Sequence, residues 1–238
     1  MRILEWQTGD RAELRAFIRP YLVAGFWSRD EVEESVTEWV DDSGQIDPAE
    51  AAALVHEMWN ERLAEQTTWT DTGDYGRLHY TFTQLESEGI LARMCFACCT
   101  TCATSEIDFE RTVNPNPPDW YRYHQWAYTY FHEQDALRLA SANPTLYLGF
   151  SAFRAHPELP AALLEAYHRN DPDAQAEVHA RTDTFVGRRI VQLAQHFGLN
   201  TSWSGSGKTR IEAVSYTHLR AHETSLHLVC RLLLEKTD

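Results

Sequence analysis

The chain has 238 residues, 43% of them hydrophobic, so it is long enough to bury a sizeable core as one large domain or two small ones. Its 21 basic and 35 acidic residues give a formal net charge of −14, which argues against a nucleic-acid partner and against an anionic membrane surface, because both need a positive surface. No stretch approaches the roughly 18 consecutive apolar residues of a membrane span.

The first third of the chain is predicted to be helical. Residues 10–23 place apolar side chains at helical spacing, and Pro20 is expected to kink or end this helix. A capping box at residues 28–31 predicts the start of a second helix. An aspartate followed by a proline at residues 47–48 predicts the start of a third.

The hydrophobic period changes after the next helix. Residues 75–88 are predicted to form that helix, which ends at Gly89, and residues 90–96 then have the pattern of a strand. A loop rich in proline at 114–118 precedes a second strand at 126–132. Alternation places four side chains of this second strand on one face: Trp126, Tyr128, Tyr130 and His132.

The remaining elements alternate between helices and short strands. They are a short helix from about Asp135, a strand at 146–150, a helix at 156–169, a long helix at 173–198, and a hairpin of residues 201–203 and 209–212. The inward side of the long helix is predicted to carry Phe185, Val186, Ile190, Leu193 and Phe197.

These elements predict an α+β fold in which a helical N-terminal half packs on a small mixed sheet in the C-terminal half. Residues 1–213 are expected to form a single domain, mainly helical over 1–89 and built of strands and helices over 90–213. Residues 214–238 resemble a translated sequencing adapter, so we expect a non-native tail there. Its histidines and Cys230 are therefore not candidates for a site.

Four of the five cysteines lie in residues 95–102, in the pattern C-x-x-C-C-x-x-C. The N-terminus is polar and gives no secretory signal, so we expect the cytosol, where thiols stay reduced and a cysteine cluster favours metal binding or redox chemistry. One zinc ion cannot easily take all four sulfurs, because Cys98 and Cys99 point to opposite faces of an extended chain. A partial set is therefore favoured, such as Cys99 and Cys102 with another donor, for which the best candidates are His132 and Glu106.

Two other interpretations of the cysteines stay open. Cys99 and Cys102 could form a thiol–disulfide pair at a helix start, although the order of the predicted elements does not show a β-α-β unit around them. The cysteines could also simply pack as small apolar side chains. Outside this stretch, His132 with its neighbouring carboxylates could do acid–base work or be a structural histidine. The acidic helical half could meet a basic partner, and no particular protein partner is predicted.

Six segments of the chain resemble the pattern of a known family. They are Gly25-Phe26-Trp27 and residues 59–64, 89–93, 98–102, 131–135 and 186–189. With these segments the chain resembles an uncharacterised, mainly actinobacterial family that is known only as a domain of unknown function, over about residues 20–213. The resemblance implies no activity. Its C-C-x-x-C and F-H-x-Q-D patterns match Cys98, Cys99, Cys102 and His132 but not clearly Cys95. The resemblance therefore favours three cysteines with His132 as the ligands of one zinc-like ion.

Overall fold

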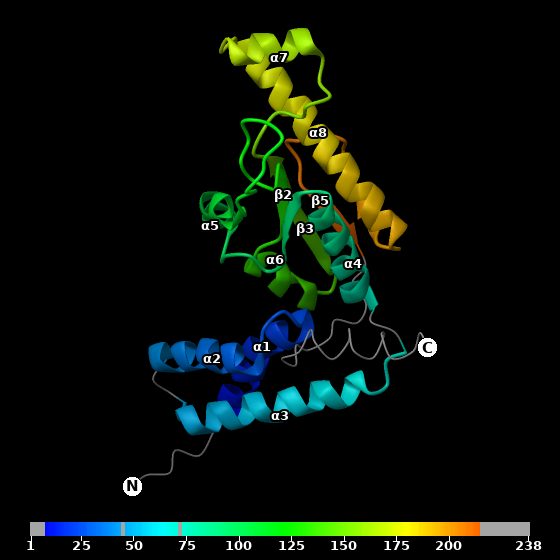
Figure 1. Cartoon of the computed structure of the whole chain (residues 1–238). Helices are drawn as coiled ribbons and strands as arrows, with labels where there is room; N and C mark the ends of the chain where they lie inside the picture. The colour runs from blue at the N-terminus through cyan, green and yellow to red at the C-terminus, as the bar shows by residue number, and fades with distance from the viewer. Residues whose placement is uncertain (1–7, 44–45, 71–72, 215–238) are drawn as a thin grey trace. The chain divides into compact units, whose positions relative to one another are not determined.

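The computed structural model describes residues 8–43, 46–70 and 73–214. The chain forms two compact units, of which the first holds residues 8–70 and the second residues 73–214 of the described part. We call them the N-terminal and the C-terminal unit (Figure 1). The predicted α+β class is confirmed, since helices dominate the first unit and a five-stranded sheet lies in the second. That residues 1–213 behave as a single domain stays a prediction.

The N-terminal unit consists of three helices: α1 (Thr8–Ala24), α2 (Arg29–Ser43) and α3 (Pro48–Gln66). Pro20 lies inside α1 and does not end it. The predicted capping box is present, because the Ser28 amide donates to the Glu31 carboxylate over 2.7 Å and the Glu31 amide donates to the Ser28 hydroxyl over 3.3 Å. The side chain of Asp47 caps α3 as predicted.

The core of this unit is one apolar stripe from each helix. The buried side chains are Leu14, Ile18, Leu22, Val32, Val36, Val40, Leu54, Val55, Met58 and Trp59. On the surface, Arg15 bridges α1 to α3 through Glu57 and Glu61, at 2.7 and 2.8 Å. No helix among the described residues of either unit is long and apolar enough to cross a membrane.

The C-terminal unit is a mixed sheet with helices on both sides. Its elements are α4 (Gly73–Ser87), β1 (Ile90–Arg93), α5 (Thr100–Glu106), the 3-10 helix η1 (Ile107–Glu110), β2 (Ala127–Tyr130), α6 (Glu133–Leu137), the 3-10 helix η2 (Arg138–Ala140), β3 (Thr145–Ala152), α7 (Ala161–His168), α8 (Pro172–His196), β4 (Asn200–Ser202) and β5 (Ile211–Val214). The strand order is β1-β2-β3-β5-β4. Strands β1 and β2 are parallel and the other neighbours antiparallel.

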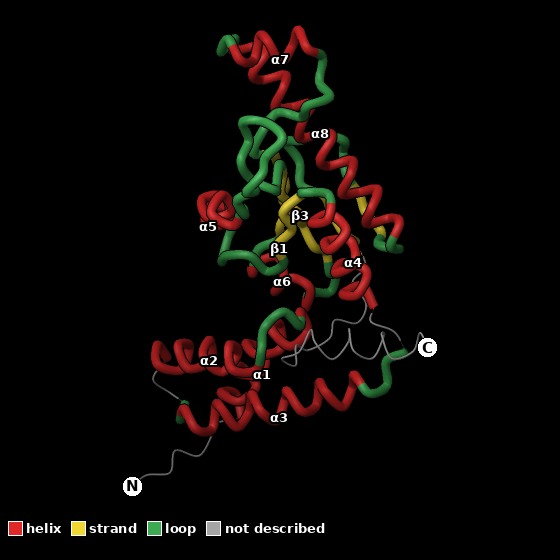
Figure 2. The backbone as a smooth tube through the Cα atoms, viewed as in Figure 1, coloured by secondary structure: helices red, strands yellow, loops and turns green. Residues whose placement is uncertain are grey.

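Helices α4 and α8 lie on one side of the sheet, and α5 lies on the other (Figures 1 and 2). Helix α8 comes very close to the sheet at Gly187, where a methyl group would stand 2.6 Å from the Trp203 ring and 2.9 Å from Phe150. Arg189 of α8 also binds Glu88, just after α4, with contacts of 2.6 and 2.5 Å. Phe185 was predicted to face inward, but its side chain is 43% exposed and lies against His156.

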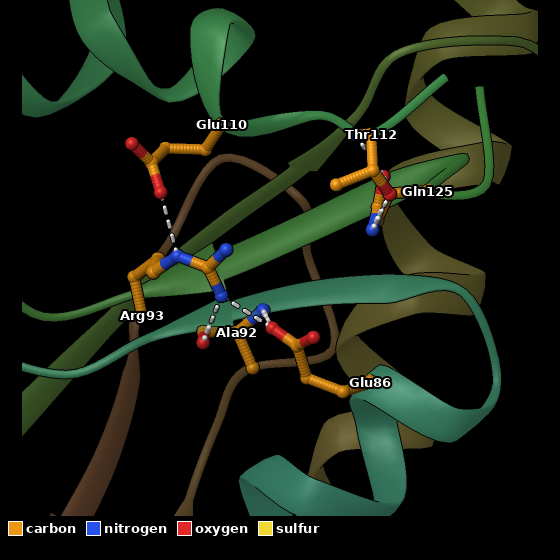
Figure 3. A network of polar contacts seen from close by, with 6 residues as sticks. All are labelled: Glu86, Ala92, Arg93, Glu110, Thr112 and Gln125. Carbon is orange, nitrogen blue, oxygen red and sulfur yellow. Dashed lines mark hydrogen bonds and ion pairs between the residues drawn. The ribbon is translucent and has the colours of Figure 1, made fainter. Parts of the chain in front are cut away.

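A polar network fixes the edge strand β1 (Figure 3). The Glu86 carboxylate of α4 accepts from the Ala92 amide over 3.0 Å and from the Arg93 guanidinium over 2.5 Å. The other side of Arg93 donates to Glu110 of η1 over 2.9 Å. An edge strand leaves amides without strand partners, so Glu86 satisfies one of them. Because β1 leads directly into the cysteines, this network holds the start of that loop.

The structure corrects three sequence predictions around the cysteines. The strand predicted at 90–96 ends at Arg93, and the strand predicted at 126–132 ends at Tyr130. His132 is therefore the N-cap of α6 and not a strand residue. A β-α-β arrangement does surround the cysteines, because β1 and β2 are parallel neighbours with α5 between them in the chain.

Candidate metal centre

The cysteine loop is held along the segment that follows β2. The Phe131 amide donates to the Arg93 carbonyl over 3.3 Å, and the Phe96 amide donates to the Phe131 carbonyl over 2.8 Å. One step further, the Glu133 amide donates to the Ala97 carbonyl over 3.1 Å. The loop is thus fixed by backbone hydrogen bonds up to the residue before Cys98.

Two residues of this loop take the left-handed conformation that favours glycine. Cys95 has a φ of 50° and Ala97 a φ of 59°. Such a conformation costs of order 1–3 kcal/mol per residue and is found where surrounding structure or function imposes it. This conformation ends the strand early and turns the chain. Cys98 and Cys99 are then the last two residues before α5.

Three sulfurs meet at this turn. The sulfur atoms of Cys98, Cys99 and Cys102 all lie within 4.8 Å of one another, and the Cys98 and Cys102 sulfurs are 3.3 Å apart. Cys98 is exposed and the other two are half-buried. None of these cysteines, nor Cys95, forms a disulfide. Cys95 does not belong to the three-sulfur group, although it was one of the four cysteines in the sequence pattern.

The surroundings shift the pKa values of Cys99 and Cys102 in opposite directions. The Cys102 backbone amide faces the Cys99 sulfur and lowers the pKa of Cys99, with smaller help from the thiols of Cys102 and Cys98, although the amide does not close a full hydrogen bond. The neighbouring sulfurs of Cys98 and Cys99 raise the pKa of Cys102 to about 12. Of Cys99 and Cys102, Cys99 therefore loses its proton first.

His132 does not point its nitrogens at this group. The Asp135 amide donates to His132 Nδ1 over 3.2 Å, and His132 Nε2 lies 3.0 Å from an Asp135 carboxylate oxygen. This pattern requires a neutral ring with its proton on Nε2. Burial lowers the pKa of His132, against the opposing effect of the Asp135 charge. The structure thus brings the three predicted cysteines together and leaves the predicted ligand His132, and also Glu106, outside the group.

Asp135 is one of the carboxylates near His132 for which acid–base work was considered, and the structure places it in a buried ion pair. It is completely buried and binds Arg210, which precedes β5, through both carboxylate oxygens, one at 3.3 Å. Arg138 adds a weaker contact at 3.5 Å. The sequence signal was limited to the spacing of His132 and Asp135, since Arg210 lies 75 positions further along the chain.

Tyr130, the last residue of β2, is close enough to Asp135 and to Cys99 for both charges to affect its pKa. Its ring fills the space above Gly149, the residue directly opposite on β3, where a methyl group would stand 2.9 Å from the ring. Burial raises the pKa of Tyr130; the Arg210 charge opposes this, and the charges of Asp135 and Cys99 add to it. The phenol therefore stays protonated beside the cysteines.

Together, the fold and the site define an α+β protein with a surface cluster of three cysteines that could hold a metal. The chain belongs to the family described as "Domain of unknown function (DUF6891)", whose model matches residues 7–220. No curated protein and no solved structure matches the chain. The match ends inside the segment predicted to be an adapter-derived tail. Val214, the first residue of that segment, ends β5, and residues 215–238 lie outside the part that the structure describes.

Proposed function

We propose that Cys98, Cys99 and Cys102 bind one zinc-like ion. The observation that carries the proposal is the meeting of three sulfurs within 4.8 Å. Zinc–sulfur bonds of about 2.3 Å at tetrahedral angles put sulfurs about 3.8 Å apart. Since the Cys98–Cys102 distance is 3.3 Å and the other sulfurs lie within 4.8 Å, small side-chain rotations would complete the geometry. Thiolates are donors that zinc prefers.

The fourth ligand predicted from the sequence, His132, stays a prediction. Either ring nitrogen would have to leave Asp135 before it could bind an ion. Breaking the contacts between His132 and Asp135 costs free energy, because Asp135 is buried. We therefore propose the three cysteines as the core of the site.

Metal analysis of the purified protein tests this proposal. We expect about one equivalent of zinc in protein purified without chelators, and a lower melting temperature after chelation, because a bound ion stabilises the folded state. Cys99→Ser and Cys102→Ser should lose the metal. Cys95→Ser is the matched control, since Cys95 lies in the same loop but outside the group. Protein that holds no zinc after refolding with the ion would overturn the proposal.

A second function is favoured by the position of Cys99. It is the N-cap of α5 with a lowered pKa, and Cys102 lies three positions later with a raised pKa. In a thiol–disulfide exchange the Cys99 thiolate would attack a substrate disulfide and release one substrate thiol. The Cys102 thiol would then lose its proton and displace the second, leaving a Cys99–Cys102 disulfide.

The rate of alkylation against pH separates these two functions in metal-free protein. A poised nucleophile should react at its full rate well below pH 8, because its thiolate is already present. A rate that rises only above about pH 8 would exclude exchange chemistry at Cys99. Both functions need reduced thiols, so we propose that the protein works in the cytosol.

A further inference from the structure

Building on the proposed metal site, we propose that the ion's fourth coordination position is open to solvent and binds a small exogenous thiol. Zinc in proteins prefers four donors, and sites with three protein ligands keep the fourth position for water or a substrate. Among the residues that the structure describes, no other His, Cys, Asp or Glu donor lies within 4.8 Å of all three sulfurs. The fourth donor therefore comes from outside this set.

The side chains of His132 and Tyr130 make their contacts elsewhere. Both nitrogens of His132 face Asp135, whose carboxylate also holds Arg210. Moving His132 to the ion would remove one donor from the buried Asp135 carboxylate and leave the Asp135 amide with only the His132 carbonyl as acceptor. The Tyr130 ring packs against Gly149 on β3. An external donor replaces only water and breaks none of these contacts.

The cluster is accessible from solvent. Cys98 is exposed, and the next residues along α5, Thr100 and Thr101, are exposed as well. Helix α5 lies on the side of the sheet opposite α4 and α8, so neither of these two helices covers it (Figure 1). A small molecule could therefore reach the fourth position without a movement of the fold.

The donor set selects the class of ligand. Three thiolates turn a divalent ion into a centre of charge −1 and supply much electron density, so the ion acidifies bound water less than a histidine-rich site does. Hydrolysis is therefore disfavoured, and a soft sulfur donor matches the centre. In the binding step the bound water leaves, the thiol sulfur bonds to the ion, and the thiol proton passes to solvent. No oxidant or reductant is consumed.

Cobalt-substituted protein tests this inference. The full chain, with Cys230→Ser to remove the fifth cysteine, is loaded with Co²⁺ and titrated with 2-mercaptoethanol. We expect a saturable rise of the sulfur-to-cobalt charge-transfer absorption by about one third, the ratio of four bound thiolates to three. Ethylene glycol, which has a hydroxyl in place of the thiol, should give no such rise. Cys95→Ser should respond like the parent protein.

The outcomes separate the two levels of the proposal. Failure to bind zinc or cobalt would refute the metal site itself. Stoichiometric cobalt with no change on thiol addition would leave the metal site standing and overturn the open position. Cobalt-dependent dimers by light scattering would also overturn it, because a second copy would then supply the fourth ligand. If His132 is the fourth ligand, only His132→Ala, not the parent protein, should respond to the thiol.

Discussion

Replacement of Asp135 by alanine should be among the most damaging single changes in the C-terminal unit. The Asp135 side chain is 0% exposed, and its main partner Arg210 is 31% exposed. Removing one member of a buried ion pair costs roughly 3–5 kcal/mol, because the other charge loses its partner. Water still reaches part of Arg210, which lowers this cost. The Nε2–H of His132 also loses its acceptor, which costs about 1–3 kcal/mol for a buried donor.

We therefore expect Asp135→Ala to lower the free energy of unfolding by about 3–4 kcal/mol. For a chain of this size that corresponds to a fall in melting temperature of roughly 6–16 °C. Urea unfolding followed by circular dichroism measures the first quantity and calorimetry the second. Asp135→Asn keeps the shape and one acceptor oxygen, so it should cost less than Asp135→Ala.

The matched control is Glu177→Ala, which removes an exposed ion pair with Arg181 on α8 of the same unit. Exposed pairs of this spacing contribute about 0.3–0.5 kcal/mol. The reasoning fails if Asp135→Ala costs no more than this control, because the buried cluster would then contribute nothing beyond a surface pair. A cost shared equally by Arg138→Ala and Arg210→Ala would also contradict it, since Arg138 makes only the weaker contact.

Three further outcomes are expected. Burial lowers the pKa of His132 and His156, so each takes up a proton at a lower pH in the folded protein than in the unfolded chain, where the usual pKa is about 6.5. Stability should therefore be complete above that pH and fall as the pH drops below it, and the fall should be smaller in His156→Gln. Gly187→Ala should cost about 1–3 kcal/mol in urea unfolding, because the added methyl group would stand 2.6 Å from the Trp203 ring; an unchanged midpoint would contradict this packing. Deletion of residues 215–238 should change the free energy of unfolding by no more than about 0.5 kcal/mol, and a larger loss would count against an adapter origin.

Local features of this chain were predictable because each depends on a few neighbouring residues. The capping box of Ser28 and Glu31 and the Asp47 cap are contacts across three positions or fewer, and both are present. The β4–β5 hairpin, the start of α3 and the approximate ends of α4 also follow the sequence pattern. The α+β class could be predicted in the same way, since it is the sum of such local periods.

Element ends near the cysteines were less predictable. The pattern over 90–96 fits a strand, but the chain leaves the extended conformation at Cys95, whose φ is 50°. No residue type in this stretch signals that turn, because glycine usually marks a left-handed conformation. The turn is fixed instead by two backbone hydrogen bonds, from the Phe96 amide to the Phe131 carbonyl and from the Glu133 amide to the Ala97 carbonyl.

By itself the sequence determined that three cysteines lie close together, since Cys98, Cys99 and Cys102 are separated by at most four positions. Only the tertiary structure decided what His132 does. Its ring could serve a metal or a carboxylate, and Asp135 holds it because Arg210, 75 positions away, fixes that carboxylate in the core. A contact of this kind depends on the pairing of β5 between β3 and β4, and no local pattern encodes that pairing.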